Sequence, residues 1–362
     1  MTAQKSFKII VTFALAILPF FAFSQEEGSK IEEAAKKFNA SEMIMHHIND
    51  TYGWHFFGSG DSSFTIPLPV ILFTDNGLVA FMSSAFHHDY NGKYVVEKNG
   101  MNFVNYHEKV YQLDPGATAL QKNEEGEIIN ASRPWDFSIT KNVAAMMLTI
   151  IVMLIIFFSL AGHHRKSKVA PKGFNNLMES LVLFVRDEIA RPQIGEAKYK
   201  KFMPFLLTVF FFIWITNLLG LLPGAANVTG NIAVTVSLGL FTLIIIVANA
   251  NMDFWKHTVW MPGIPTFVKP ILALVEILGV FVIKPVALMI RLFANITAGH
   301  IIILSILSLI FILESAGVAG ISVPFALFIT ILELLVAFLQ AFIFTMLSAL
   351  FIGMAVAEHE HH

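Results

Sequence analysis

The stretch Lys284–Leu313, KPVALMIRLFANITAGHIIILSILSLIFIL, has the composition of a helix buried in lipid, yet it contains Arg291. A charged side chain at bilayer depth costs roughly 2.5–3.5 kcal/mol on insertion scales. Arginine does not avoid this cost by losing its proton, because its pKa is above about 12. The charge must therefore be offset by a carboxylate, a water-filled cavity or an ion path. The alternative is an anchor at the membrane surface, and Lys284 fits that role better, because long apolar sequence continues past Arg291.

The composition of the whole chain is that of a polytopic membrane protein with a polar appendage. Of its 362 residues, 56% are hydrophobic and only 14% are charged, and the mean hydropathy is +0.67. These values are too apolar for an ordinary soluble protein. A net charge of −2 argues against a nucleic-acid partner. The chain contains no cysteine, which excludes disulfides, thiolate metal sites and cysteine nucleophiles.

The N-terminus has the pattern of a secretory signal. Lys5 and Lys8 precede the apolar run Ile9–Phe23, and small residues around Ser24 offer a cleavage site. We therefore expect residues 1–24 to be a signal peptide, with an uncleaved first transmembrane helix as the alternative. Either interpretation predicts that the following segment is exported.

Residues 25–135 are expected to form a small β-containing extracytoplasmic extension. Runs rich in β-branched and aromatic residues occur at Phe64–Phe73 and Tyr94–Glu97. Lys98-Asn99-Gly100 has the composition of a hairpin turn before a further run at Met101–Tyr106. Six histidines of this extension match no known metal-site spacing, so we interpret them as surface or interface residues and keep metal binding as the alternative. They are His46, His47, His55, His87, His88 and His107.

The first membrane span is expected at Asn142–Ala161, which is long enough to cross about 30 Å of hydrocarbon. The basic cluster His163–Lys168 follows it and marks the cytoplasmic side by the positive-inside rule. This orientation agrees with an exported N-terminal segment. Apolar residues then recur at helical spacing over Phe174–Ile189, which predicts an amphipathic helix at the cytoplasmic interface. Arg191-Pro192 is expected to end that helix.

Two further spans, Phe202–Leu222 and Asn231–Ala250, are expected to run outward and back. Asn217 and Asn231 lie toward the outer ends of these spans. Each is interpreted either as a helix cap or interhelical hydrogen bond, or as part of a polar path. Residues 251–269 combine Trp and Lys with turn residues, which is typical of a segment that lies on the membrane surface.

From Pro270 to the C-terminus the sequence stays apolar, with scattered polar residues. We expect two long helices, at 270–313 and 322–357, joined by a break at 315–324 and folded into a hairpin. A helix of about 40 residues extends about 60 Å, which is twice the hydrocarbon thickness. Such helices must tilt strongly or break, and Pro285 is the expected point of a break.

The polar residues of this hairpin are expected to form two layers. At about 100° per residue, Asn295 lies on nearly the same face as Arg291, whereas His300 points to the opposite face. Glu333 and Gln340 are seven residues apart and share a face. If Gln340 is level with Arg291, Glu333 falls within about two residues of the level of His300. A His–Glu pair suits proton handling, because both groups titrate near neutrality when their surroundings shift them.

Three motifs occur in the membrane part. They are Asn217-Leu218-Leu219-Gly220-Leu221-Leu222-Pro223, then Arg291-Leu292-Phe293-Ala294-Asn295 followed by Ala298-Gly299, and finally Leu339-Gln340-Ala341-Phe342-Ile343-Phe344. Together they resemble subunit a of the F-type ATP synthase, the stator of its membrane proton channel. The stretch from Asn231 to Thr235 also resembles this family. The resemblance runs from about residue 140 to the C-terminus, and the second and third motifs at this separation are its most specific part.

The resemblance implies a role for each residue of the hairpin. Arg291 matches the arginine that faces the carboxylate of the rotating c-ring, favours its ionised form and blocks direct leakage between two offset half-channels. Gln340 matches a glutamine packed near that arginine, and Asn295 matches a polar residue that lines the path. His300 and Glu333 match two inlet positions that carry the same residue types in reverse order in some members.

Three more matches concern the ends of the path. Asn217 and Asn231 match polar positions toward the outer side. Glu276 resembles the carboxylate of the cytoplasmic half-channel, but its distance to Lys284-Pro285 is one residue longer than in the family's pattern. Gly220 stands where some members carry an acidic residue, so that group is missing from any relay in this chain.

The sequence therefore predicts an all-α polytopic membrane domain at 136–362, with about five membrane helices that include a long tilted C-terminal hairpin. The resemblance implies a proton-translocating stator subunit that is not an enzyme by itself and needs no cofactor. It implies the c-ring, the peripheral stalk subunit b, other ATP synthase subunits and the lipid bilayer as partners. The expected location is the bacterial inner membrane, with the C-terminus cytoplasmic.

A proton- or ion-coupled secondary transporter is the main alternative. Such a protein usually shows repeated halves with matched broken helices, and the five expected spans show no such repeat. An intramembrane enzyme is disfavoured, because the sequence has no H-E-x-x-H, G-x-S-x-G or G-x-x-x-x-G-K-[ST] motif. The C-terminal Ala357–His362 is interpreted as a solvated tail rather than a metal chelator.

Overall fold

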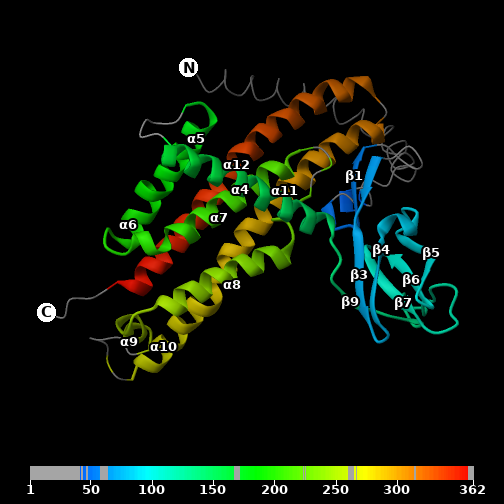
Figure 1. Ribbon diagram of the computed structural model, residues 1–362, viewed down its shortest axis with the longest axis horizontal. Helices are drawn as coiled ribbons and strands as arrows, with labels where there is room; N and C mark the ends of the chain where they lie inside the picture. Colours follow the sequence, from blue (N-terminus) through cyan, green and yellow to red (C-terminus); the bar gives the residue numbers. More distant parts are fainter. Residues whose placement is uncertain are drawn as a thin grey trace, which may run out of the picture. The chain divides into compact units, whose positions relative to one another are not determined.

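The computed structural model describes residues 41, 44, 45, 48–57, 64–166, 172–222, 224, 226–259, 265, 267–313 and 315–357 (Figure 1). The expected signal peptide, His46, His47 and the C-terminal histidines lie outside these residues. The chain divides into two compact units. One contains His300–Ile331 with residues 1–47, and the other contains Ile48–Gly299 with Leu332–His362.

Among the described residues, five helices are long and apolar enough to cross a membrane, as the sequence predicted. They are α4 (Lys141–Lys166), α7 (Tyr199–Gly220), α8 (Ile232–Asn249), the continuous segment of α10 (Lys269–Leu278), η4 (Gly279–Ile283) and α11 (Lys284–Leu313), and α12 (Ala316–Val356). The helices α5 (Phe174–Phe184), η3 (Val185–Ala190), α6 (Arg191–Ile194) and α9 (Met252–Val259) are shorter.

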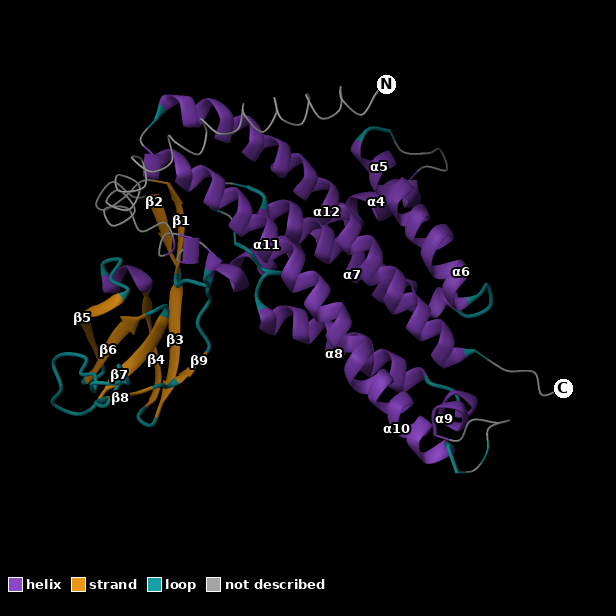
Figure 2. Cartoon of the chain, turned by 180° about the vertical axis from the view of Figure 1, so that it is seen from behind, coloured by secondary structure: helices purple, strands orange, loops and turns teal. Residues whose placement is uncertain are grey.

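The segment before α4 contains the expected β structure (Figure 2). Its strands are β1 (Gly53–Phe57), β2 (Phe64–Pro67), β3 (Pro69–Thr74), β4 (Gly77–Met82), β5 (Asn91–Lys98), β6 (Met101–Tyr106), β7 (Lys109–Leu113), β8 (Ala131–Ser132) and β9 (Trp135–Asp136). They form antiparallel sheets in the orders β1–β2, β4–β3–β9 and β5–β6–β7–β8. The second and third sheets bury one core between them, to which Leu72, Val79, Phe103 and Val110 contribute.

The predicted hairpin at Lys98-Asn99-Gly100 is confirmed. Lys98 pairs with Met101 across a two-residue turn. Asn99 and Gly100 have φ angles of 53° and 74°, and positive φ at both central residues is what the type I′ hairpin turn requires.

In the larger unit, the membrane helices pack around one apolar core. Phe210 and Phe211 of α7 are fully buried in it, and Leu288 and Leu292 place one side of α11 against it. Ala341 brings α12 into the same core. One side of α11 is therefore committed to the bundle, which leaves its other side for a different role.

The C-terminal end of α12 is tied to the ends of α7 and α8. Lys198 Nζ and the side-chain amide of Asn251 each donate a hydrogen bond of 2.8 Å to the backbone oxygen of Val356. These bonds satisfy a carbonyl that has no partner within the helix. Gly353 lets α12 approach α6, because a Cβ at this position would collide with the backbone carbonyl of Gln193.

Two predicted helix boundaries were wrong. The helical segment does not end at Arg191-Pro192, because the π turn η3 leads directly into a new α-helical turn that extends to Ile194. Pro192 lies in the first turn of α6, where a proline sacrifices no intrahelical hydrogen bond. The helical segment ends at Gly195, where φ is 93°. The second helix of the hairpin begins at Ala316 rather than at 322 and includes Pro324, and membrane helices tolerate such prolines when neighbouring groups satisfy the freed carbonyl.

The first helix of the hairpin departs from α geometry just before Pro285. Residues Gly279–Ile283 form a π-helical turn, and the N–H of Lys284 donates to the carbonyl of Gly279. Such turns hold one extra residue within an otherwise regular helix. The expected irregularity is thus a π turn in a continuous helical segment.

Charged groups gather where the β structure meets α4. The Asp50 carboxylate accepts hydrogen bonds from the Thr140 hydroxyl at 2.9 Å and from the Asn142 backbone N–H at 3.0 Å. It thereby satisfies donors at the helix N-terminus. Lys141 is buried and interacts electrostatically with Asp50 and Glu108. Burial raises the pKa of Glu108 to about 7, while Lys141 opposes the shift and Asp50 adds to it.

The raised pKa of Glu108 predicts a stability that falls as pH rises. Between about pH 4.5 and 7 the folded chain holds a proton that the unfolded chain releases, so the free energy of unfolding decreases across this window. Thermal unfolding of the purified chain in detergent at several pH values measures this slope. We expect Glu108→Gln to flatten it, and Glu97→Gln, on the exposed part of β5, to leave it unchanged. Parallel pH curves for all three proteins would contradict the prediction.

Candidate functional site

Arg291 lies on an exposed side of α11. The buried residues Leu288 and Leu292 lie about 60° and 100° around the helix from it, so the Arg291 side adjoins the side that packs in the helical core. Exposed residues recur at intervals of three and four residues along the Arg291 side, and this spacing puts them on one helix face. We call this the Arg291 face, and it consists of Ala287, Arg291, Ala294, Asn295 and Ala298. Asn295 thus shares the face of Arg291, as its spacing predicted.

The positive charge of Arg291 is not neutralised within the described part of the chain. None of the ion pairs between described residues includes this guanidinium. The other members of the Arg291 face are Ala and Asn, which carry no charge and occupy little volume. The face therefore combines a permanent charge with a surface that another helix can approach closely.

Gln340 lies level with Arg291, which is the register assumed for the antiparallel hairpin. Its Nε2 donates a hydrogen bond of 3.4 Å to the backbone oxygen of Arg291, and only 3% of the residue is exposed. The contact joins α11 and α12 through a main-chain atom. It leaves the guanidinium itself available on the exposed side.

Glu333 is buried about two turns of α12 before Gln340, with 7% of its surface exposed. Its carboxylate packs on the backbone of Gly299, where an added Cβ would collide with it. Among the described residues, Glu333 Oε2 has no hydrogen-bond partner. Because a buried polar atom without a partner is costly, this oxygen is suited to holding a proton or bonding water. Glu333 therefore lies level with Gly299 of α11.

Asn217 and Asn231 have different environments. Asn217 is buried on α7 and accepts a hydrogen bond of 2.6 Å from the Thr229 hydroxyl, while its Nδ2 has no partner among the described residues. Asn231 is the N-cap of α8, and its Oδ1 accepts from the Ala233 N–H at 2.9 Å. The cap interpretation is therefore confirmed for Asn231, whereas Asn217 retains an unused donor in the protein interior.

The π turn compensates for the extra residue between Glu276 and Lys284. At about 100° per residue, eight residues of regular α-helix would place these two side chains about 80° apart. When the π turn absorbs one residue, the remaining seven place them within about 20°. Lys284 interacts electrostatically with Glu276, and its Nζ lies 5.1 Å from the centroid of the Phe351 ring. The one-residue difference from the family pattern therefore does not turn Glu276 to another face.

Two buried hydroxyl groups near the hairpin were missed in the sequence. The Oγ1 atoms of Thr297 on α11 and Thr345 on α12 have no hydrogen-bond partner among the described residues. A helical threonine normally donates to the carbonyl four residues earlier, as Thr330 does to Ala326 at 2.9 Å. In the sequence, these two residues are marked only as threonines within apolar helices. That does not distinguish them from threonines whose hydroxyl groups bond to the backbone of their own helix.

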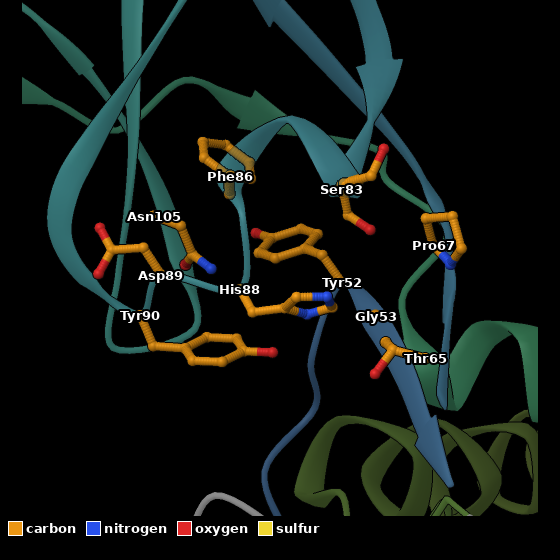
Figure 3. Close-up of a pocket in the computed structure, with 11 residues that line it drawn as sticks. Tyr52, Gly53, Thr65, Pro67, Ser83, Phe86, His88, Asp89, Tyr90 and Asn105 are labelled. Carbon is orange, nitrogen blue, oxygen red and sulfur yellow. The ribbon is translucent and has the colours of Figure 1, made fainter. Parts of the chain in front are cut away.

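A small polar pocket lies in the β structure, apart from the helices (Figure 3). Tyr52, His88, Tyr90 and Asn105 help to line it, and its volume is about 20 Å³. This is room for one water molecule rather than for an organic ligand. Asn105 is buried and its Oδ1 has no partner among the described residues, so one water would meet its need.

The model of the family described as ATP synthase A chain matches residues 143–353, which is more than half of the chain. The chain belongs to the ATP synthase A chain family. This confirms the resemblance that the motifs indicated. A second family model, described as a domain of unknown function, matches residues 43–137. The family match covers the Arg291 face, Glu333 and Gln340, and the second match covers the β structure.

Curated members of the ATP synthase A chain family share much of this sequence. The ATP synthase subunit a of Myxococcus xanthus is 46% identical over 258 residues, which are 69% of this chain and 84% of that protein. That of Chloroherpeton thalassium is 48% identical over 234 residues, 63% of this chain and 69% of that protein. That of an Anaeromyxobacter species is 38% identical over 344 residues, 93% of this chain and 75% of that protein.

The contact between Gly299 and Glu333 predicts that this family member does not tolerate a methyl group at residue 299. We expect Gly299→Ala to destabilise the hairpin by about 1–3 kcal/mol, because the added Cβ forces the Glu333 carboxylate to move. Gly320→Ala is a matched control, since a Cβ there meets nothing within 4 Å. It should be neutral or stabilise by up to about 1 kcal/mol. Thermal unfolding of the purified variants measures both, and equal effects would contradict the packing.

Proposed function

We propose that this chain is the proton-translocating stator subunit of the membrane sector of an F-type ATP synthase, with two offset half-channels that lead to and from a c-ring carboxylate. The subunit makes and breaks no covalent bonds, and other subunits make ATP. The Arg291 face is the observation that carries the proposal. It presents one permanent positive charge, unpaired among the described residues, on a surface of small side chains.

The chemistry of the Arg291 face specifies the partner that would complete it. A guanidinium in a membrane needs a carboxylate or water, and small residues allow a neighbouring helix to approach closely. A c-ring helix with one carboxylate meets both requirements. The peripheral stalk subunit b and the other ATP synthase subunits would then bind surfaces outside this face.

Arg291 would act on each c-ring carboxylate through its charge. A fixed cation favours the ionised form of a passing acid, so the acid releases its proton before it passes Arg291. The same cation repels protons and blocks direct leakage between the half-channels. An acid that has been reprotonated carries no charge and enters lipid at lower cost, so each carboxyl group would travel around the barrier through the lipid in its neutral form.

The inlet would run past Asn217, His300 and Glu333, with Asn295 and Gln340 beside Arg291. The support is the buried Glu333 carboxylate with a partnerless oxygen, together with the unused donor of Asn217. Each group offers a polar contact where the surrounding helix is apolar. Asn231 would serve this path only indirectly, as the N-cap that begins α8.

The outlet would pass Glu276, which the π turn keeps on the side of Lys284. Lys284 would hold the Glu276 carboxylate in place by charge attraction. The C-terminal end of α12 lies near the start of α7, and by the positive-inside rule this would be the cytoplasmic side of a bacterial inner membrane. The β structure would then be extracytoplasmic. Each charge crossing a potential of 100 mV is worth about 2.3 kcal/mol.

A secondary transporter is the less favoured function. Its inverted or parallel repeats would place matched broken helices in two halves. In the described chain, the π turn beside a proline at η4 has no counterpart in α12, whose proline lies in regular helix. A second π turn, η3, also precedes a proline, Pro192, but it lies outside the five helices long enough to cross a membrane.

If Arg291 favours the ionised c-ring carboxylate and blocks leakage between the half-channels, Arg291→Ala should abolish ATP-driven proton pumping. The complex should still assemble and its soluble part should still hydrolyse ATP, because Arg291 lies on a surface and supports no core packing. Pumping is measured by acidification of inverted membrane vesicles, and hydrolysis by phosphate release. Lys256→Ala, on the exposed side of α9, is the control and should pump normally. Full pumping by Arg291→Ala would refute the proposed role.

If His300 and Glu333 act together in the inlet, exchanging the two residues should impair pumping less than removing either one. The double variant His300→Glu with Glu333→His keeps one imidazole and one carboxylate in the inlet, so it should retain more pumping than His300→Ala or Glu333→Ala. The three variants are compared in the same vesicles at matched assembly. An exchange that pumps no better than the single losses would show that the two residues are not partners.

The π turn predicts that one residue is dispensable within it. Deleting Val282 should leave an α-helical turn that keeps Glu276 on the side of Lys284, so pumping should persist. Deleting Ile290, an equally exposed residue in regular helix, rotates Glu276 by about 100° relative to Arg291 and should abolish pumping. Equal loss in both deletions would contradict the compensating role of the turn.

A further inference from the structure

The β4–β3–β9 sheet has one buried face and one exposed face, and the exposed face is apolar. Phe73 of β3 pairs with Leu78 of β4 on one side and with Trp135 of β9 on the other. The chain after β9 continues alongside β3, because the N–H of Phe137 donates to the carbonyl of Ile71. Alternate residues of neighbouring strands therefore line up on one surface.

We call this surface the outer sheet face. Its exposed members are Phe73, Leu78, Ala80, Met82, Trp135 and Phe137. Trp135 is 74% exposed, Phe137 65% and Leu78 62%. None of the six carries a charge, and Trp135 is the only one with a hydrogen-bonding side chain. A contiguous apolar surface of this kind on a folded domain marks an interaction site for a membrane or a protein.

The outer sheet face is continuous with the membrane part of the chain. Phe137 lies only four residues before Lys141, where the first membrane helix begins, so at most about 14 Å of chain separates them. In both views the β5–β8 sheet lies on the side of the β4–β3–β9 sheet remote from α8 (Figures 1 and 2). The outer sheet face is therefore turned toward the side on which the helices lie.

A direct contact holds the β structure close to the ends of the helices. Trp54 Nε1 on β1 donates a hydrogen bond of 2.9 Å to the carbonyl of Gly224, which follows α7. A Cβ on Gly224 would lie 2.8 Å from the Cα of Phe56, so the two backbones touch. The contact is made by the β1–β2 sheet, and only Leu68 separates the end of β2 at Pro67 from the start of β3 at Pro69. The β4–β3–β9 sheet therefore cannot move far from the membrane boundary while this contact is intact.

We infer that the outer sheet face lies on the lipid surface at the Lys141 end of α4, with its side chains among the headgroups. Trp and Phe favour this zone, because their rings are apolar and Trp also offers an N–H to the polar boundary. A lipid surface fits better than a protein partner, because the face ends within four residues of a membrane helix and is turned toward the helices. The domain would then steady the outer ends of α4 and α7 against the bilayer.

Site-directed spin labelling tests this inference on the full chain, which has no native cysteine. Nitroxides are attached to Leu78→Cys or Trp135→Cys, and the chain is reconstituted into vesicles of phosphatidylcholine and phosphatidylglycerol. Oxygen concentrates in lipid and a nickel chelate concentrates in water, so their relative collision rates report the surroundings of the label. Glu97→Cys, exposed on β5 of the other sheet, is the matched control.

We expect the oxygen-to-nickel collision ratio to be several-fold higher at residues 78 and 135 than at residue 97. The same ratio at all three positions would overturn the inference, because the outer sheet face would then be in water. Shielding of residues 78 and 135 from both reagents would also overturn it, because a protein, for instance a second copy, would cover the face. A third label, Phe73→Cys, controls for a local disturbance caused by any single label. If the face lies on lipid, the labels at residues 73, 78 and 135 must all give a high oxygen-to-nickel collision ratio.

Discussion

The charge of Arg291 constrains the rest of this structure, because arginine stays protonated and the helix around it is otherwise apolar. The chain does not solve this problem internally, since no described carboxylate pairs with the guanidinium. It buries Leu288 and Leu292 on one side of α11 and leaves Arg291 exposed among small residues on the adjoining side. A membrane protein that exposes an unpaired cation in this way needs a carboxylate from another subunit, or water, to offset the charge.

The hairpin of α11 and α12 positions the other polar groups relative to that charge. Three contacts in the larger unit define its register: Lys284 with Phe351, Arg291 with Gln340, and Gly299 with Glu333. Each pair is nearly level in two antiparallel helices. Gly299 is the closest of these approaches, and it is what allows a carboxylate to be buried beside the backbone of the neighbouring helix.

The β structure is joined to the membrane part by polar contacts and carries an apolar surface of its own. Asp50 satisfies donors at the start of α4, and Trp54 bonds the carbonyl of Gly224 beyond α7. These contacts join the β structure to the ends of two helices that are long and apolar enough to cross a membrane. The buried charges at this joint make its stability dependent on pH, whereas the outer sheet face would make its position dependent on lipid.

The sequence by itself determined the number and approximate positions of the membrane helices, the β hairpin at Asn99-Gly100 and the faces of Arg291, Asn295, Glu333 and Gln340. These features depend on local composition and on helical or strand period, which neighbouring elements do not alter. Its errors at Pro192 and Pro324 came from treating proline as a stop, although its cost depends on which carbonyl loses a donor.

Only the tertiary structure decided how the segments meet. The π turn, the packing of Gly299 on Glu333, the cap formed by Asn231 and the partnerless hydroxyls of Thr297 and Thr345 all depend on hydrogen bonds or distances that composition does not encode. The apolar outer sheet face likewise needed strand pairing to bring β3, β4 and β9 together. Residues far apart in sequence become neighbours only when register and close approach are set, and those depend on the whole fold.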